Sequence, residues 1–354
     1  MGAFKRGYVR PLDLNTGRVD LTHGSGGRAM VQLVAELFSR HLGNEYLGQG
    51  DDGAVLPAPV IAGQAGRLVM STDCHVVSPL FFPGGDIGCL SVHGTINDVA
   101  MMGATPLYLA AGFILEEGFA LADLARIVES MARAAHVAGV PVVTGDTKVV
   151  ERGKGDGVFI TTTGVGVLAD GIELGGSRAR PGDAVIISGS LGDHGVAIMS
   201  QRENLSFDAP IASDTAALHR LVAAMLATGG DIHCLRDPTR GGLAATLNEI
   251  AAQSGVGMML QEKAIPVKPV VAAACEFLGL DPLCVANEGK LLAICAAADA
   301  ERLLAAMRAH PLGRDAAVIG EVIADDHHFV QLTTAFGGRR IVDWLAGDQL
   351  PRIC

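Results

Sequence analysis

The chain has 354 residues, of which 49% are hydrophobic and 18% charged, so it is long enough to bury two cores of ordinary size. A formal net charge of −11, with no block of Lys or Arg to offset it, argues against nucleic acid as a partner. The longest apolar runs, such as "PLYLAAGFIL", stop short of the roughly 20 residues that a membrane-spanning helix needs. The first ten residues lack the apolar core of a signal peptide. We therefore expect a cytoplasmic protein with no membrane partner.

The first half of the chain predicts one α+β unit. An N-terminal arm with the Gly-rich loop "HGSGG" is expected over residues 1–45, and a domain over residues 46–170. The near-helical spacing of Ile87, Leu90, Ile96 and Val99 predicts a helix within residues 84–106, and "LADLARIVESMARAAHVAGV" predicts a second one. Apolar runs with β-branched residues predict strands in "GRLVMSTDCHVV", "VPVVTGDTKVV" and "DGVFITTTGVGVL".

A second α+β unit is expected over residues 171–335, beginning at the Pro-Gly-Asp turn of "RPGDAVIISGSLGDHG". Strands are predicted in that segment and in "KLLAICAA", "AAVIGEVI" and "HHFVQLTT". Helices are predicted in "TRGGLAATLNEIAAQSG" and "DAERLLAAMRAH". Residues 336–354 are expected to form a tail with at most one short strand, mobile in at least one state.

The seven cysteines include no CxxC pair, and their odd number argues against a disulfide framework. Cys275, Cys284 and Cys295 lie in apolar segments, where burial would raise the thiol pKa and make the side chain unreactive. Cys354 differs because it is the last residue. Its position fits either a frayed end with an incidental thiol or a thiol that the tail delivers to a site.

Six aspartates are expected in loops or at strand ends within two residues of Gly, Ser, Thr or Asn: Asp51, Asp52, Asp73, Asp98, Asp146 and Asp237. Mg²⁺ takes oxygen ligands and often joins carboxylates to substrate phosphates, so several such loops indicate a nucleotide and metal site. For any one of them, a helix cap or an Asx turn is an equally good explanation. The Gly-rich loops "HGSGG", "SGSLGDHG" and "DPTRGG" could bind an anion, but none is a P-loop.

Two further charged residues allow two interpretations each. Lys148, close to Asp146, would either contact a phosphate or form a surface ion pair. Glu288, in "VANEGKLL", is either a desolvated base or a turn residue paired with Lys290. The remaining candidates show no zinc-binding spacing and are expected to be hydrogen-bonded loop histidines: His23, His75, His93 and His194.

Taken together, the motifs resemble those of the HypE family of hydrogenase maturation proteins, the carbamoyl dehydratases. The resemblance runs from about residue 21 to the last residue and includes "LTHGSGGRAM", "VTGDTKVV", "LRDPTRGG", "ANEGKL" and the terminal "PRIC". It implies membership of the wider PurM-like superfamily, typified by aminoimidazole ribonucleotide synthetase, whose members are ATP-using dimers. The implied fold has two α+β domains, and the N-terminal domain pairs across the homodimer into a barrel-like interface.

The same resemblance implies a reaction. The carbamoyltransferase HypF would place a carbamoyl group on Cys354, and ATP would drive its dehydration to a thiocyanate. The cyano group would then pass to iron on the HypC-HypD complex and become a cyanide ligand of the [NiFe]-hydrogenase centre. Glu288 would accept protons, and Lys148 would stabilise charge on the transferred phosphoryl group.

The resemblance also implies two ligand sets. The ATP-binding residues would be Gly26, Gly27, Asp52, Asp73, Asn97, Asp98, Thr144, Gly145, Asp146 and Lys148. The Mg²⁺ ligands would be Asp51, Asp52, Asp73, Asp98, Asp146 and Asp237.

Two other functions stay open at this point. An enzyme of the same superfamily could phosphorylate a small molecule, as selenophosphate synthetase or thiamine-monophosphate kinase does, and Cys354 would then be incidental. Alternatively, the protein could be a non-catalytic scaffold that presents the thiol and uses nucleotide only to gate partner binding. Deleting the last four residues would leave the first activity intact, and the second function predicts no ATP hydrolysis linked to the tail.

Overall fold

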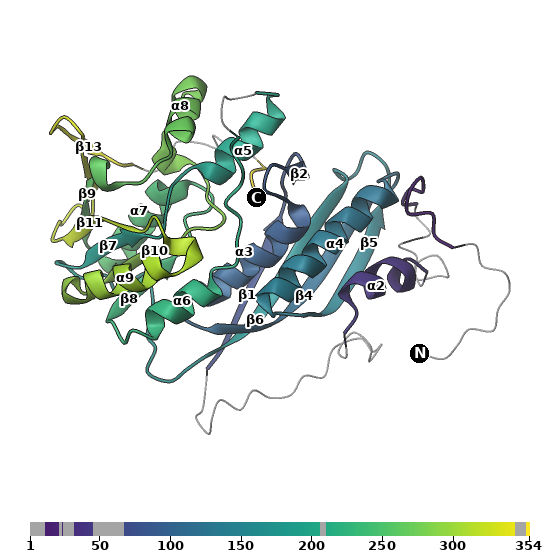
Figure 1. Cartoon of the computed structure of the whole chain (residues 1–354), viewed down its shortest axis with the longest axis horizontal. Helices are drawn as coiled ribbons and strands as arrows, with labels where there is room; N and C mark the ends of the chain where they lie inside the picture. Colours follow the sequence, from purple (N-terminus) through teal and green to yellow (C-terminus); the bar gives the residue numbers. More distant parts are fainter. Residues whose placement is uncertain (1–10, 21–22, 24–31, 45–66, 206–209, 344–351) are drawn as a thin grey trace.

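The computed structural model describes residues 11–20, 23, 32–44, 67–205, 210–343 and 352–354. These residues form two α+β units that lie side by side, each built on its own β-sheet (Figure 1). The prediction of a two-domain α+β fold is thereby confirmed. Within the described part of the chain, no helix is both long and apolar enough to cross a membrane.

The first unit is built on a four-stranded sheet with the strand order β1-β6-β4-β5. Its strands are β1 (Arg67–His75), β4 (Thr105–Glu116), β5 (Val142–Val150) and β6 (Val158–Leu168). β4 and β5 are parallel because α4 (Leu121–Ala138) carries the chain back between them, whereas the other two pairs are antiparallel. β1 and β5 are therefore the two edges of the sheet.

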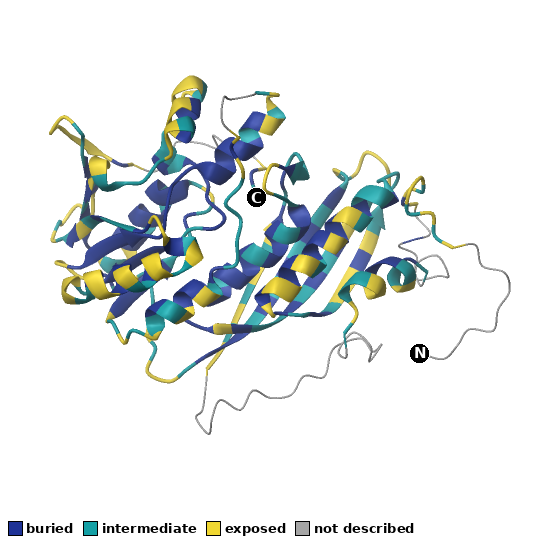
Figure 2. Ribbon diagram, in the orientation of Figure 1, coloured by how far each residue is buried: buried dark blue, intermediate teal, exposed yellow. Residues whose placement is uncertain are grey.

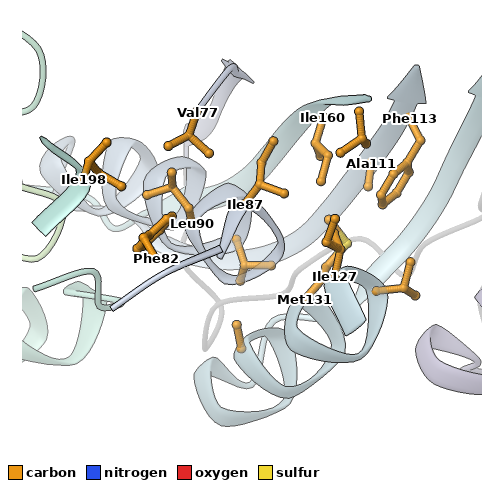
Figure 3. Close-up of a cluster of buried hydrophobic side chains, with 14 of the residues drawn as sticks. Val77, Phe82, Ile87, Leu90, Ala111, Phe113, Ile127, Met131, Ile160 and Ile198 are labelled. Atoms are coloured by element: carbon orange, nitrogen blue, oxygen red, sulfur yellow. The ribbon is translucent and has the colours of Figure 1, made fainter. Parts of the chain in front are cut away.

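Two helices, α3 (Ile87–Met101) and α4, cover one face of this sheet. Asp86 begins α3 because its carboxylate accepts hydrogen bonds from the N–H groups of Gly88 and Cys89, at 2.7 and 3.2 Å. Apolar side chains fill the space between helices and sheet (Figure 3), among them Ile87, Leu90, Ala111, Phe113, Ile127, Met131 and Ile160.

The other face of the sheet, which we call the open face, carries exposed apolar side chains. Leu68 and Met70 on β1 are 71% and 75% exposed, and Ile114 on β4 is 43% exposed. Alternate residues along each strand point to opposite faces, and the resulting change between buried and exposed positions can be followed in Figure 2. Nothing within the described chain covers these three side chains.

The second unit is built on a seven-stranded sheet with the order β13-β12-β9-β11-β7-β10-β8. β12 and β9 are parallel, and the other neighbours are antiparallel. The strands are β7 (Ala184–Ile187), β8 (Ile232–Arg236), β9 (Gly257–Gln261), β10 (Leu292–Cys295), β11 (Ala317–Ile323), β12 (Val330–Thr333) and β13 (Arg339–Ile341). The helices are α5 (Asp193–Arg202), α6 (His219–Leu226), α7 (Gly242–Ser254), α8 (Pro269–Leu278) and α9 (Ala300–Ala309).

Short elements complete the described chain. The strands β2 (Phe81–Phe82) and β3 (Gly85–Asp86) pair with each other, and the chain also has η2 (Val34–Phe38), α2 (Ser39–Leu42), η4 (Glu262–Ala264), η5 (Pro282–Cys284), η6 (Ala297–Asp299) and η7 (Pro311–Gly313).

The two units share buried side chains. Ile198 of α5 belongs to the same apolar cluster as Val77 and Leu90 of the first unit (Figure 3). At its other end, α3 contributes Ala100 and Met101 to a cluster of the second unit. The chain ends in this contact region, beside α5 and β2 (Figure 1).

Candidate active site

The last three residues of the chain are docked between the two units. The N–H of Val76 donates to a main-chain carboxylate oxygen of Cys354 at 2.9 Å, and the N–H of Ser78 donates to the carbonyl of Arg352 at 3.1 Å. The side chain of Ile353 is 2% exposed within the apolar cluster around α5. The terminal thiol is therefore held against the body of the protein in this structure.

Glu288 lies on the loop before β10 and is 4% exposed. Its N–H donates to Asp214 at 3.0 Å, and its carbonyl accepts from the Asn97 amide at 3.3 Å. Lys290 binds Asp214 at 2.8 Å, so it is not the partner of Glu288 that one interpretation of the sequence required. Within the described residues, Oε1 of Glu288 has no hydrogen-bond partner. The backbone is fixed and this carboxylate oxygen stays available to a bound group.

Three aspartates lie close to Glu288 and come from separate segments: Asp73 on β1, Asp98 on α3 and Asp237 after β8. Burial, and then the carboxylates of Asp98 and Asp73, raise the pKa of Asp237 to about 7. Burial, and then Asp237 and the other acids, raise the pKa of Glu288 well above its usual value. Burial also raises the pKa of Asp98, which accepts a hydrogen bond from Ser71 at 2.8 Å. These crowded carboxylates favour the uptake of protons or of a cation.

The docked thiol is a poor nucleophile. Burial, and then the Glu288 carboxylate, raise the pKa of Cys354, and the Arg240 guanidinium opposes this shift. A thiol that stays protonated does not attack an electrophile, because the thiolate is the reactive form. In the docked position, we therefore expect a reaction of a group already attached to the sulfur and not an attack by the thiol itself. The prediction for three other cysteines is confirmed, since burial raises the pKa of Cys275 and Cys284 to about 11 and that of Cys295 to about 12.

The predicted residues of β5 lie elsewhere. The register places Asp73, Thr162, Ala111 and Gly145 in one row across the sheet, so β5 is three strand spacings, or about 14 Å, from β1. Thr144 and Asp146 alternate with Gly145, which puts them on the open face, away from α3. Lys148 lies on that face too and pairs with Asp146 at 3.1 Å, with both side chains about two-thirds exposed. Within one chain, these residues do not meet the acids around Glu288.

Asn97, a predicted ATP ligand, uses its side-chain amide within the protein. Its Nδ2 donates to the carbonyls of Ala216 and Glu288, at 3.0 and 3.3 Å, and its Oδ1 accepts from the N–H of Leu218 at 2.8 Å. Asn97 thus ties α3 to the loop that carries Glu288, and its contact with ATP stays a prediction.

Four predicted ligands lie outside the described residues: Gly26, Gly27, Asp51 and Asp52. Among the residues that the structure does describe, no three or more His, Cys, Asp or Glu side chains are arranged to hold a metal ion. The metal ligands therefore stay a prediction.

Two residues near the tail were not identified as functional from the sequence. Arg240, in the "DPTRGG" loop, acts electrostatically on both Cys354 and His75. His194 was expected to be a loop histidine, but it lies in the first turn of α5 and contacts the tail at 2.8 Å. His75 and His93, also expected in loops, lie on β1 and α3.

Fold and site together define a protein of the aminoimidazole ribonucleotide synthetase class. The family model described as "AIR synthase related protein, N-terminal domain" matches residues 50–168, and its C-terminal counterpart matches residues 180–333.

The chain belongs to the HypE family of carbamoyl dehydratases. It is 69% identical over 353 residues to "Carbamoyl dehydratase HypE" of Cupriavidus necator, a match that covers 100% of this chain and 99% of that protein. The solved structure of HypE in complex with ATP is 52% identical, with a TM-score of 0.90, and the match covers 95% of this chain and 99% of the other. A chain of a solved HypE-HypF complex is 49% identical, with a TM-score of 0.76 and coverage of 88% and 99%.

Proposed function

We propose that the chain uses ATP to dehydrate an S-carbamoyl group on Cys354 to a thiocyanate, and so supplies the cyanide ligand for the iron centre of [NiFe]-hydrogenase. The observation that carries this proposal is the docking of the terminal thiol beside Glu288, a buried acid with an available oxygen. Membership of the carbamoyl dehydratase family supports the reaction, and the ATP complex of a HypE protein supports the nucleotide.

The need for ATP follows from the leaving group. Hydroxide leaves too poorly for R–S–C(=O)–NH₂ to lose its oxygen directly. The carbamoyl oxygen attacks the γ-phosphorus, the bond to ADP breaks and one nitrogen proton is lost. The carbon–oxygen bond then breaks with phosphate as the leaving group, the second nitrogen proton is lost, and the electrons left on nitrogen complete the triple bond of R–S–C≡N.

Glu288 is the group that we propose accepts the nitrogen protons. Its raised pKa makes the ionised carboxylate a stronger base than an exposed glutamate. Its burial keeps bulk water from the carbamoyl carbon, which limits hydrolysis of the phosphorylated intermediate. Asp214 and Asn97 hold its backbone and so fix the direction from which it acts.

The acids Asp73, Asp98 and Asp237 fit a divalent cation in charge and in chemistry. Besides burial, Asp98 and Asp73 raise the pKa of Asp237, which indicates unbalanced negative charge, and carboxylate oxygens are the ligands that Mg²⁺ prefers. We propose that these three hold Mg²⁺ together with Asp51 and Asp52. Bound there, the ion would neutralise the phosphates of ATP.

The open face supports a homodimer. Leu68, Met70 and Ile114 form an exposed apolar surface on a sheet, which would be buried if two such sheets packed face to face as a barrel-like interface. Asp146 and Lys148 lie on the same face, so in the dimer they point toward the partner subunit. We therefore propose that Lys148, with Thr144, Gly145 and Asp146, serves the nucleotide site of the partner subunit.

The tail must also leave the docked position. We propose HypF as the enzyme that carbamoylates Cys354, supported by the HypE-HypF complex, and the HypC-HypD complex as the acceptor of the cyano group. Both steps need an accessible sulfur, whereas the docked thiol has a raised pKa. We propose that the tail alternates between docked and undocked positions, in the cytoplasm, where ATP is available.

The variant Cys354→Ala separates this function from a small-molecule kinase of the same fold. The dehydratase predicts that ATP consumption in the presence of HypF and its carbamoyl donor is lost in the variant. A kinase acting on a small molecule would keep its ATP consumption. A solved thiamine-monophosphate kinase from Stenotrophomonas maltophilia matches this chain at 22% identity, which supports only the shared fold.

A further inference from the structure

We infer that His194 is a positioning residue for the tail, and that its Nε2–H holds the carbonyl of Ile353 and thereby places Cys354 against Glu288. His194 is 0% exposed in the first turn of α5. Its Nε2 lies 2.8 Å from the carbonyl oxygen of Ile353, and its Nδ1 lies 2.7 Å from the hydroxyl of Ser213.

The partners determine which ring nitrogen carries the proton. A carbonyl oxygen can only accept, so Nε2 is the donor to Ile353. Burial lowers the pKa of His194, although Asp214 and the bond to Ile353 oppose the shift, so the ring is neutral and Nδ1 is an acceptor. The Ser213 hydroxyl oxygen accepts the N–H of Thr215 at 3.1 Å, which leaves its proton to donate to Nδ1. Ser213 therefore fixes the tautomer that binds the tail.

The bond from His194 to Ile353 lies next to Cys354 and therefore helps to fix the position of that residue. Ile353 directly precedes Cys354. On either side of its carbonyl, the N–H of Ser78 binds the carbonyl of Arg352 and the N–H of Val76 binds a main-chain carboxylate oxygen of Cys354. Those two bonds come from the first unit. The second unit holds the tail through α5, where His194 binds Ile353 and Arg202 donates from Nη2 to the carbonyl of Arg352 at 3.0 Å. Phe82 packs edge-on against the imidazole, with the ring centres 5.5 Å apart, and limits its movement.

Undocking removes the acceptor of the imidazole N–H, and the loss of this hydrogen bond favours the docked state. The bond from His194 to the Ile353 carbonyl also does not depend on the side chains of the tail. His194 thus binds the same backbone group whether the sulfur carries hydrogen, a carbamoyl group or a cyano group. The use of this contact in the reaction rests on the proposed function. The contact itself can be tested without that function, by alkylation of Cys354.

Two amide variants form a matched pair. In His194→Gln the side-chain amide nitrogen can reach the position of Nε2, so the bond to Ile353 is kept. In His194→Asn the amide reaches only the position of Nδ1, so the contact with Ser213 is kept and the bond to Ile353 is lost. The full-length proteins, free of nucleotide, are alkylated with iodoacetamide, and each cysteine peptide is followed by mass spectrometry.

We expect His194→Asn to label Cys354 roughly five- to tenfold faster than the parent chain, as the loss of one buried hydrogen bond predicts, and His194→Gln to stay within about twofold. Cys234 and Cys295, which are 1% and 0% exposed, should stay unlabelled in all three proteins. Equal rates at Cys354 in His194→Asn and the parent chain would overturn the inference, as would equal increases in both variants. Labelling of Cys234 and Cys295 along with Cys354 would assign His194 to general stability and also overturn it.

A second measurement separates the tail from catalysis. Carbamoylation by HypF, which uses the undocked tail, should proceed at the parental rate or faster in His194→Asn, whereas dehydration with Mg-ATP should slow by a similar five- to tenfold factor. Equal slowing of both steps would contradict a positioning role. If the parent chain shows no dehydration, the proposed function fails, and the alkylation rates still decide the role of His194.

Discussion

Glu288 lies beside Cys354, and after burial it is the largest cause of the raised pKa of that thiol. The two residues are therefore close enough to interact in the docked state. The thiol is suppressed as a nucleophile there, while the carboxylate has an oxygen without a hydrogen-bond partner among the described residues. This combination fits an enzyme whose substrate is a group already attached to its own terminal sulfur.

The first prediction concerns the base. Glu288→Gln keeps the shape and burial of the side chain but cannot accept a proton, so we expect dehydration to fall by about 10²- to 10⁴-fold. ATP affinity, measured by calorimetry, should change little. The control is Glu276→Gln, an exposed position on α8, which should turn over normally. Normal turnover by Glu288→Gln would rule out the assignment.

The second prediction concerns the crowded acids. The folded-state pKa of Asp237 is raised to about 7 from a usual value of 3.8, so ionisation of this group weakens the folded state progressively as the pH rises from about 4 through 7. Asp237→Asn removes this effect. The gain in unfolding free energy over the parent chain should be larger at pH 8 than at pH 5, by about 1 to 3 kcal/mol. Denaturant melts at the two pH values measure it, and an identical gain at both would contradict the raised pKa.

The third prediction concerns the open face. Met70→Asp places a charge in the centre of the proposed dimer interface, and burying it without a partner would cost several kcal/mol. We expect a monomer by sedimentation velocity at micromolar concentration. Phe277→Asp is the matched control, because Phe277 is 72% exposed on α8 of the other unit. A dimer that survives Met70→Asp would exclude this face as the interface.

The fourth prediction concerns Lys148. If Lys148 serves the partner subunit, Lys148→Ala and Glu288→Gln chains are each inactive alone, but a mixed dimer contains one intact site. Random mixing of equal amounts gives half mixed dimers, so about a quarter of the parental activity should return. The two variants must be unfolded and refolded together to allow exchange. No recovery, in a mixture shown to contain mixed dimers, would place Lys148 in the site of its own chain.

Part of this picture could be read from the sequence. The strands β1, β5 and β6 and the helices α3 and α4 follow from β-branched runs and helical spacing. β4 was not predicted, because Ala110, Ala111 and Gly112 interrupt its aromatic and aliphatic residues, although it is a central strand with two neighbours. Its pairing with β5 and β6 makes it a strand, and the sequence of the segment alone does not specify that pairing.

The chemistry of the site was also only partly predictable. Glu288, Asp73, Asp98 and Asp237 were identified from the polar residues around them, but their mutual proximity depends on four segments that meet only in the fold. Lys148 and Asp146 were assigned to the same nucleotide site, yet the pleat of the sheet places them on its opposite face. His194 is not part of a recognisable motif. Its partner is a main-chain carbonyl of the tail, and because every residue has one, the sequence does not identify this contact.

The most direct test follows the mass of the tail itself. The purified protein is carbamoylated on Cys354 with HypF, separated from it, and incubated with Mg-ATP, and the C-terminal peptide is then weighed. We predict that the peptide loses the mass of one water while one ATP is converted to ADP and phosphate for each chain. A carbamoylated peptide that keeps its mass while ATP is present, or that loses water equally well without ATP, would contradict the account.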